Sequence, residues 1–65
     1  MKPTVIVTRE KGKWIANVTV TEDKEAFSAS GEDSDPQVAV YRGLYSLYAC
    51  IADHYKKHFQ ITVTL

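Results

Sequence analysis

Two histidines and one cysteine carry the side chains best suited to metal binding or nucleophilic catalysis. His54 and His58 stand four residues apart, the spacing at which two helical side chains can bind one metal ion. No third ligand follows at a recognisable spacing, and the dipole of a helix favours histidine near its C-terminus without any metal. Cys50 lies one turn before His54, but a catalytic thiolate also needs an oriented base and a positively charged setting. We therefore predict no metal site, no cofactor and no enzymatic activity, and we expect Cys50 to be a partly buried structural residue.

Basic and acidic segments alternate along the chain. Residues 1–19 are net positive, residues 22–35 are acidic, and Lys56 and Lys57 are basic, so that the 65 residues have a formal net charge of zero. A chain of hairpins and a helix would bring residues 9–13 against 32–35, and residues 22–25 against Lys56 and Lys57. A nucleic-acid site needs several uncompensated basic side chains on one face. Internal pairing of these charges therefore argues against nucleic-acid binding.

Two periodicities in the spacing of apolar residues predict the strands and the helix that hold these side chains. Apolar residues alternate with polar ones over residues 4–30 and are interrupted by turn residues near Gly12 and Asp23, which predicts three antiparallel strands that end at Gly31. Asp35 and Pro36 are typical of a helix start, and apolar residues at three- and four-residue spacing predict a helix from Asp35 to His58. Alternation returns over residues 60–65. The predicted fold class is α+β, a single domain over residues 1–65 in the order βββαβ, with a four-stranded, mainly antiparallel sheet and one long helix packed on one face.

The two faces of this sheet differ in composition. The face toward the helix is expected to carry Val5, Val7, Trp14, Val18, Phe27, Ile61 and Val63. The other face carries Ile6 and Ile15 among threonine, serine and asparagine side chains. An antiparallel sheet can leave such a face in water, so this face is either solvated surface or a surface for a partner or a second copy. A homodimer through this open face or through a strand edge is therefore compatible with the sequence.

Four tyrosines lie beside the apolar stripe of the predicted helix: Tyr41, Tyr45, Tyr48 and Tyr55. Exposed aromatic side chains in a basic groove stack on single-stranded nucleic acid, which is the alternative interpretation of this group. Because the spacing is helical and adjoins the core stripe, we expect the tyrosines to pack in the core or at its rim. Tyr45, at the margin of the stripe, is the best candidate for an exposed contact.

The composition is not that of a disordered or a membrane-spanning chain. Hydrophobic residues make up 45% and charged residues 25% of the chain, which is typical of a globular domain. The apolar runs are too short for a membrane span, and the first residues lead directly into strand-like sequence without the apolar region of a signal peptide. We expect a cytoplasmic protein that does not enter membranes.

Two families resemble this chain. Gly12-Lys13-Trp14, Ser28-Ala29-Ser30-Gly31 and a helix from Asp35 resemble the HicB-type antitoxin domain. Pro3-Thr4-Val5 with Val7-Thr8, and Ser34-Asp35-Pro36 before an aromatic-bearing helix, look similar to small phage anti-CRISPR proteins, particularly one that acts on type I-F surveillance complexes. Both resemblances imply a compact, cofactor-free domain that occupies a surface on a larger protein. The leading hypothesis is a non-enzymatic inhibitor, encoded by a phage or mobile element, that binds a host defence complex. The alternative is an antitoxin that binds a small toxin, and a weak nucleic-acid-binding module is third.

An inhibitor that blocks a nucleic-acid site should present acidic side chains. The candidate contact residues are therefore the cluster Glu32, Asp33 and Asp35 and the cluster around Glu22 and Asp23. Because Asp35 is engaged at the helix start, Glu32 and Asp33 are expected to be the more available charges. If these acidic residues serve only to cap the helix and to keep the protein in solution, Ile6, Ile15 and Tyr45 are the remaining candidate contact residues.

Overall fold

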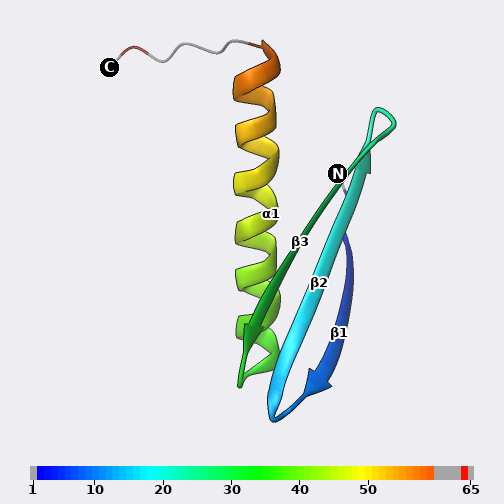
Figure 1. Ribbon diagram of the computed structural model, residues 1–65, viewed down its shortest axis with the longest axis vertical. Coiled ribbons are helices and arrows are strands. Elements are labelled where there is room, and N and C mark those ends of the chain that lie inside the picture. Colours follow the sequence, from blue (N-terminus) through cyan, green and yellow to red (C-terminus); the bar gives the residue numbers. More distant parts are fainter. Residues whose placement is uncertain (1, 60–63, 65) are drawn as a thin grey trace.

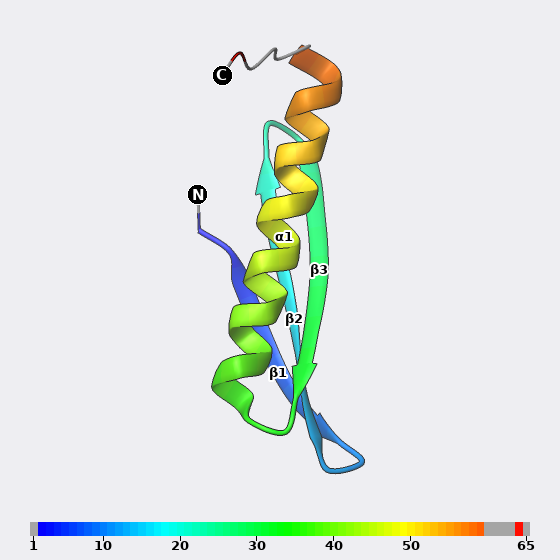
Figure 2. The same cartoon turned by 90° about the vertical axis from the view of Figure 1, so that its left-hand side faces the viewer.

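The computed structural model describes residues 2–59 and Thr64. It contains the strands β1 (Thr4–Glu10), β2 (Lys13–Glu22) and β3 (Glu25–Asp33), followed by the helix α1 (Pro36–Phe59). The sheet has the order β1-β2-β3 with antiparallel neighbours, and α1 lies across one face of it (Figures 1 and 2). The predicted α+β class and the three-stranded antiparallel sheet are thereby confirmed. The predicted fourth strand falls on residues 60–65, outside the described residues except for Thr64.

Both hairpins turn through two residues with positive φ. These are Lys11 and Gly12, at 52° and 78°, and Asp23 and Lys24, at 50° and 68°. Two such residues in succession form a type I′ turn, whose twist matches that of the flanking strands. The turns set the register: Glu10 is opposite Lys13 in the first hairpin, and Glu22 is opposite Glu25 in the second.

The helix begins at the predicted position. Asp35 Oδ1 accepts hydrogen bonds from the backbone N–H groups of Gln37 (2.8 Å) and Val38 (3.3 Å), so that Asp35 caps two donors that have no partner inside the helix. Pro36 occupies the first helical position, where its missing N–H is not needed. In the described part of the chain, residues 2–59 and 64, no helix is long and apolar enough to cross a membrane.

The core lies between α1 and the two strands nearest to it. Val18 and Val20 of β2 pack with Leu47 and Ile51 of α1, and four half-buried side chains surround them: Phe27, Ala29, Leu44 and Tyr55. Leu47 and Val18 are completely buried, and each contributes about 2 kcal/mol to stability through its removal from water. The predicted apolar stripe of the helix is therefore the face that makes the core.

Gly31 lies inside β3 and does not end it, contrary to the sequence prediction. It is opposite Ala16, and β3 continues to Asp33. A Cβ atom at position 31 would stand 2.3 Å from the backbone nitrogen of Gly43 in α1 and 2.5 Å from the carbonyl oxygen of Ala39. Glycine is present here because two backbones meet, not because the strand stops.

The helix covers β2 and β3 but hardly reaches β1. In Figure 1, β1 lies at the side of the sheet away from α1. Val5 and Val7 lie on the helix-facing side of the sheet, as predicted, but each is 37% exposed. Every residue of β1 is exposed. One helix is narrower than a three-stranded sheet, so the apolar side of β1 stays open.

Candidate functional site

The acidic cluster of Glu32, Asp33 and Asp35 spans the end of β3 and the start of α1 and is largely engaged within the molecule. Asp33 Oδ2 accepts a hydrogen bond from the backbone N–H of Asp35 (2.9 Å), and Asp33 Oδ1 lies 3.5 Å from a guanidinium nitrogen of Arg42. The Asp33 side chain is only 23% exposed. Asp35 is occupied as the helix cap. The expectation that Asp33 is an available charge is therefore wrong: its local role is to order the loop and hold Arg42.

Glu32 remains the accessible acid of this cluster. Its side chain is 61% exposed and lies 3.8 Å from Lys13 Nζ, while its carbonyl oxygen accepts a hydrogen bond from Arg42 (3.4 Å). The predicted pairing of the basic first hairpin with this acidic cluster is thus confirmed by the Lys13–Glu32 contact. An exposed ion pair at this distance contributes little free energy, so a binding partner could displace Lys13 from Glu32.

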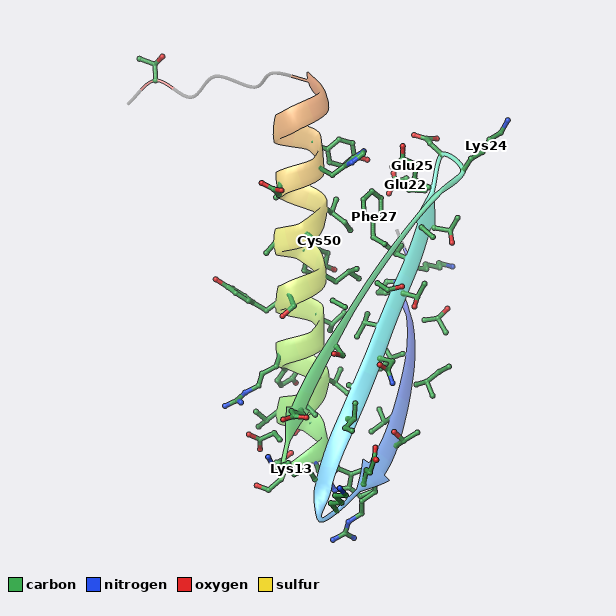
Figure 3. The ribbon with its side chains drawn as sticks, in the orientation of Figure 1. Lys13, Glu22, Lys24, Glu25, Phe27 and Cys50 are labelled. Carbon is green, nitrogen blue, oxygen red and sulfur yellow. The ribbon has the colours of Figure 1, made fainter. Side chains whose placement is uncertain are left out.

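The second acidic cluster lies at the opposite end of the sheet. Figure 3 places Glu22, Lys24 and Glu25 at the tip of the second hairpin, far from Lys13. Asp23 is exposed in the turn, Glu22 is half-buried, and Glu25 Oε2 lies 3.2 Å from His54 Nε2. The two acidic clusters therefore do not form one surface. The partners predicted for this cluster, Lys56 and Lys57, have side chains outside the described part of the structure.

Cys50 and His54 of α1 have different surroundings. Cys50 is exposed, which corrects the expectation of partial burial. His54 packs edge-on against Phe27, with ring centroids 5.0 Å apart, and pairs with Glu25. Within the described residues no group of three or more histidine, cysteine, aspartate or glutamate side chains could hold a metal ion; the side chain of His58 is outside them.

Ile6 and Ile15 share the sheet face opposite the helix, as predicted. Their register partners are Asn17 and Thr8, respectively, so the two isoleucines are diagonal neighbours. Ile6 is 60% exposed, whereas Ile15 is half-buried beside the charged side chains of the first hairpin, where Glu10, Lys11, Lys13 and Glu32 line an open depression of about 320 Å³. This face offers one exposed apolar side chain among hydroxyl groups.

Three tyrosines form an exposed stripe on α1. Tyr41, Tyr45 and Tyr48 are 61%, 78% and 53% exposed, and their spacing of four and then three residues puts them on one side of the helix. The predicted exposure of Tyr45 is confirmed, whereas Tyr41 and Tyr48 do not pack in the core. The exposure of these tyrosines follows from the helical period, because positions 41, 45 and 48 lie about 100° around the helix from the stripe of Leu47 and Ile51.

A groove adjoins this tyrosine stripe. It has a volume of about 480 Å³ and lies between α1 and β3; its lining comprises Ser30, Gly31, Glu32, Val38, Tyr41, Arg42, Tyr45 and Ser46. Arg42 is held at its wall by Asp33 and by the carbonyl group of Glu32. Tyrosine and arginine are the residues most enriched among the energetically dominant contacts of protein interfaces. We call this surface, Glu32, Tyr41, Arg42, Tyr45 and Tyr48, the tyrosine surface.

Comparison of the chain with protein-family models, with curated proteins and with solved structures finds no match.

Proposed function

We propose that this chain is a non-enzymatic protein-binding inhibitor that blocks a host defence complex of the CRISPR–Cas kind by occupying one of its surfaces. The single observation that carries the binding role is the tyrosine surface. Three tyrosines more than half exposed stand beside an oriented arginine and a groove. Large exposed aromatic side chains gathered on one side of a small domain are typical of a protein interface.

The charges around this surface fit a protein partner better than a nucleic acid. Arg42 is paired with Asp33, and Lys13 is paired with Glu32. A phosphate backbone would have to compete with these carboxylates for each cation. Glu32, which borders the groove and is exposed, adds an acidic contact that suits a basic site on a protein that handles nucleic acid.

Binding of a purified type I-F surveillance complex to the immobilised chain tests this proposal. Three variants probe the candidate contacts: Tyr41→Ser with Tyr45→Ser for the tyrosines of the tyrosine surface, Glu32→Lys for its acidic member and Ile6→Ser for the open sheet face. We expect the double tyrosine variant to lose binding by about 100-fold or more, as loss of central aromatic anchors does, and Ile6→Ser to retain it. A host that expresses the chain should also plate a CRISPR-targeted phage more efficiently.

A different result would overturn the proposal. If the wild-type chain neither binds the complex at about 10 μM, a modest affinity for a protein inhibitor, nor changes plating, inhibition of this class of complex is refuted. If binding persists in the double tyrosine variant, the tyrosine surface is not the contact.

The order of the elements favours a second candidate function, a HicB-like antitoxin. A three-stranded meander followed by one helix across a single face has the order that this resemblance implies. Co-expression with the product of a neighbouring toxin gene discriminates the two candidates. An antitoxin restores growth and co-purifies with the small toxin, whereas an inhibitor of a defence complex does neither.

A further inference from the structure

Within the described residues β1 pairs only with β2, and the central part of its other edge lacks the features that normally protect an edge strand. Such strands usually carry a central charge, a proline or a bulge. The five residues Thr4–Thr8 carry none of these, and all of them are exposed. Val5 and Val7 are apolar on the helix side of the sheet and Ile6 on the other side, so both sides of this edge are apolar.

The sequence of this edge is self-complementary. Residues 4–8 read Thr-Val-Ile-Val-Thr, which is the same in both directions. If a second copy runs antiparallel to β1 with Ile6 opposite Ile6, then Val5 is opposite Val7 and Thr4 is opposite Thr8. Pairs of β-branched residues and pairs of threonines are favourable across antiparallel strands.

The backbone of β1 has the correct phase for this pairing. Glu10 and Lys13 close a two-residue turn and therefore exchange both of their hydrogen bonds. Hydrogen-bonded pairs recur at every second residue, so Ile6 uses its backbone groups toward β2, and the N–H and C=O groups of Val5 and Val7 point out of the sheet. The register centred on Ile6 pairs these outward groups with one another.

Charge complementarity also favours the β1 edge over the β3 edge as the interface between two copies. In the register centred on Ile6, Lys2 of each copy lies opposite Glu10 of the other, so the ends of the interface carry opposite charges. The same operation on β3, centred on its middle residue Ala29, would set Glu25 opposite Asp33. Like charges directly opposite are unfavourable, and the β3 edge is thereby disfavoured.

We propose that two copies of this chain join through β1, antiparallel and centred on Ile6, to form one continuous six-stranded sheet with both helices on the same face. Four valines, Val5 and Val7 of each copy, form the floor between the two helices, where one helix alone leaves them exposed. The symmetry is two-fold, the commonest in soluble oligomers. This assembly goes beyond the proposed function and does not depend on it.

Sedimentation of the full-length chain from about 1 μM to about 1 mM, a range that spans weak and moderate association, tests for the assembly. We expect the mass to rise from 7.3 kDa toward twice that value. Val7→Pro removes an N–H that only the second copy uses and should raise the dissociation constant about tenfold or more. Ala26→Pro is the matched control, because the Ala26 N–H points out of the opposite edge of the sheet, and it should leave association unchanged.

Disulfide cross-linking tests the register without a backbone change. Both variants carry Cys50→Ser, which removes the native exposed thiol. Ile6→Cys places two thiols opposite each other in a non-hydrogen-bonded pair, where Cα atoms are about 4.5 Å apart and a disulfide fits. Thr8→Cys, on the same strand and face, lies four residues from its counterpart, about 13 Å away. We expect the first to cross-link rapidly and the second not to.

Three outcomes would overturn the proposal. The first is a chain that stays monomeric at about 1 mM, a concentration at which even weak association is visible. The second is a dimer that Val7→Pro leaves intact while that variant remains folded by circular dichroism. The third is equal cross-linking of the two cysteine variants. A monomer whose Val5 and Val7 amides are protected from hydrogen exchange would assign this edge to another segment of the same chain, and would equally refute the dimer.

Discussion

Gly31 of β3 and Gly43 of α1 meet backbone against backbone. A Cβ atom on Gly31 would lie 2.3 Å from the Gly43 nitrogen, and one on Gly43 would lie 2.8 Å from a methyl group of Val18. The sequence assigns Gly43 only a helix-propensity cost of about 1 kcal/mol relative to alanine. In the structure, glycine at this position allows the helix to approach the sheet closely beside the groove of the tyrosine surface.

Gly31→Ala should destabilise the protein by about 3 kcal/mol or more, because the new methyl group meets backbone atoms that cannot move independently. Urea unfolding followed by circular dichroism measures this. Gly43→Ala is the matched control. Its new methyl group would lie 2.8 Å from a methyl group of the buried Val18 and 3.3 Å from two backbone atoms, while the alanine gains helix propensity, so we expect a smaller loss of about 1–2 kcal/mol. Equal losses for the two variants would contradict the asymmetry of the contact.

Lys24→Gly should stabilise the protein by about 1 kcal/mol. Lys24 has a φ of 68° in the second turn, a conformation that costs a residue with a Cβ atom about 1 kcal/mol and costs glycine nothing sterically. Thermal unfolding measures the difference. Gly12→Ala, at a φ of 78° in the first turn with open space around it, should change stability in the opposite direction. A destabilised Lys24→Gly variant would show that the Lys24 side chain contributes more than its backbone costs.

Asp33 and Glu32 should respond differently to charge reversal. Asp33→Lys removes the hydrogen bond to the Asp35 N–H and places a cation beside Arg42, so we expect a loss of about 1–2 kcal/mol. Glu32→Lys changes an exposed side chain with one weak ion pair and should cost no more than about 0.5 kcal/mol. Chemical denaturation of the two single variants compares them. Similar stabilities would mean that the Asp33 contacts are not maintained in solution.

Nucleic acid should not bind appreciably. Arg42 at the groove and Lys13 of the first hairpin each lie beside a carboxylate, and Arg9 of the same hairpin lies over the ring of Trp14. Electrophoretic shift at low salt with single- and double-stranded DNA and RNA should therefore show no complex below about 100 μM. Salt-sensitive binding at low micromolar concentration would instead support the third function class, with the exposed tyrosines as stacking groups.

Sequence patterns alone determined the local structure of this protein. Two-residue alternation and the turn residues located the three strands, and Asp35 with Pro36 located the helix start to within one residue. These features depend on neighbours in the chain, where side-chain period and backbone preference act directly. The side of the sheet on which Ile6 and Val5 lie was predictable for the same reason.

Exposure and pairing were decided by the tertiary structure. A period tells which side of an element a residue occupies, but it does not tell how far the opposing element extends. Because α1 covers β2 and β3 and hardly reaches β1, Val5 and Val7 stay open. Because only one side of α1 packs on the sheet, Tyr41, Tyr48 and Cys50 stay exposed on its other sides. The engagement of Asp33 by Arg42, nine residues later in the sequence, likewise depends on how α1 lies against β3, which no local pattern encodes.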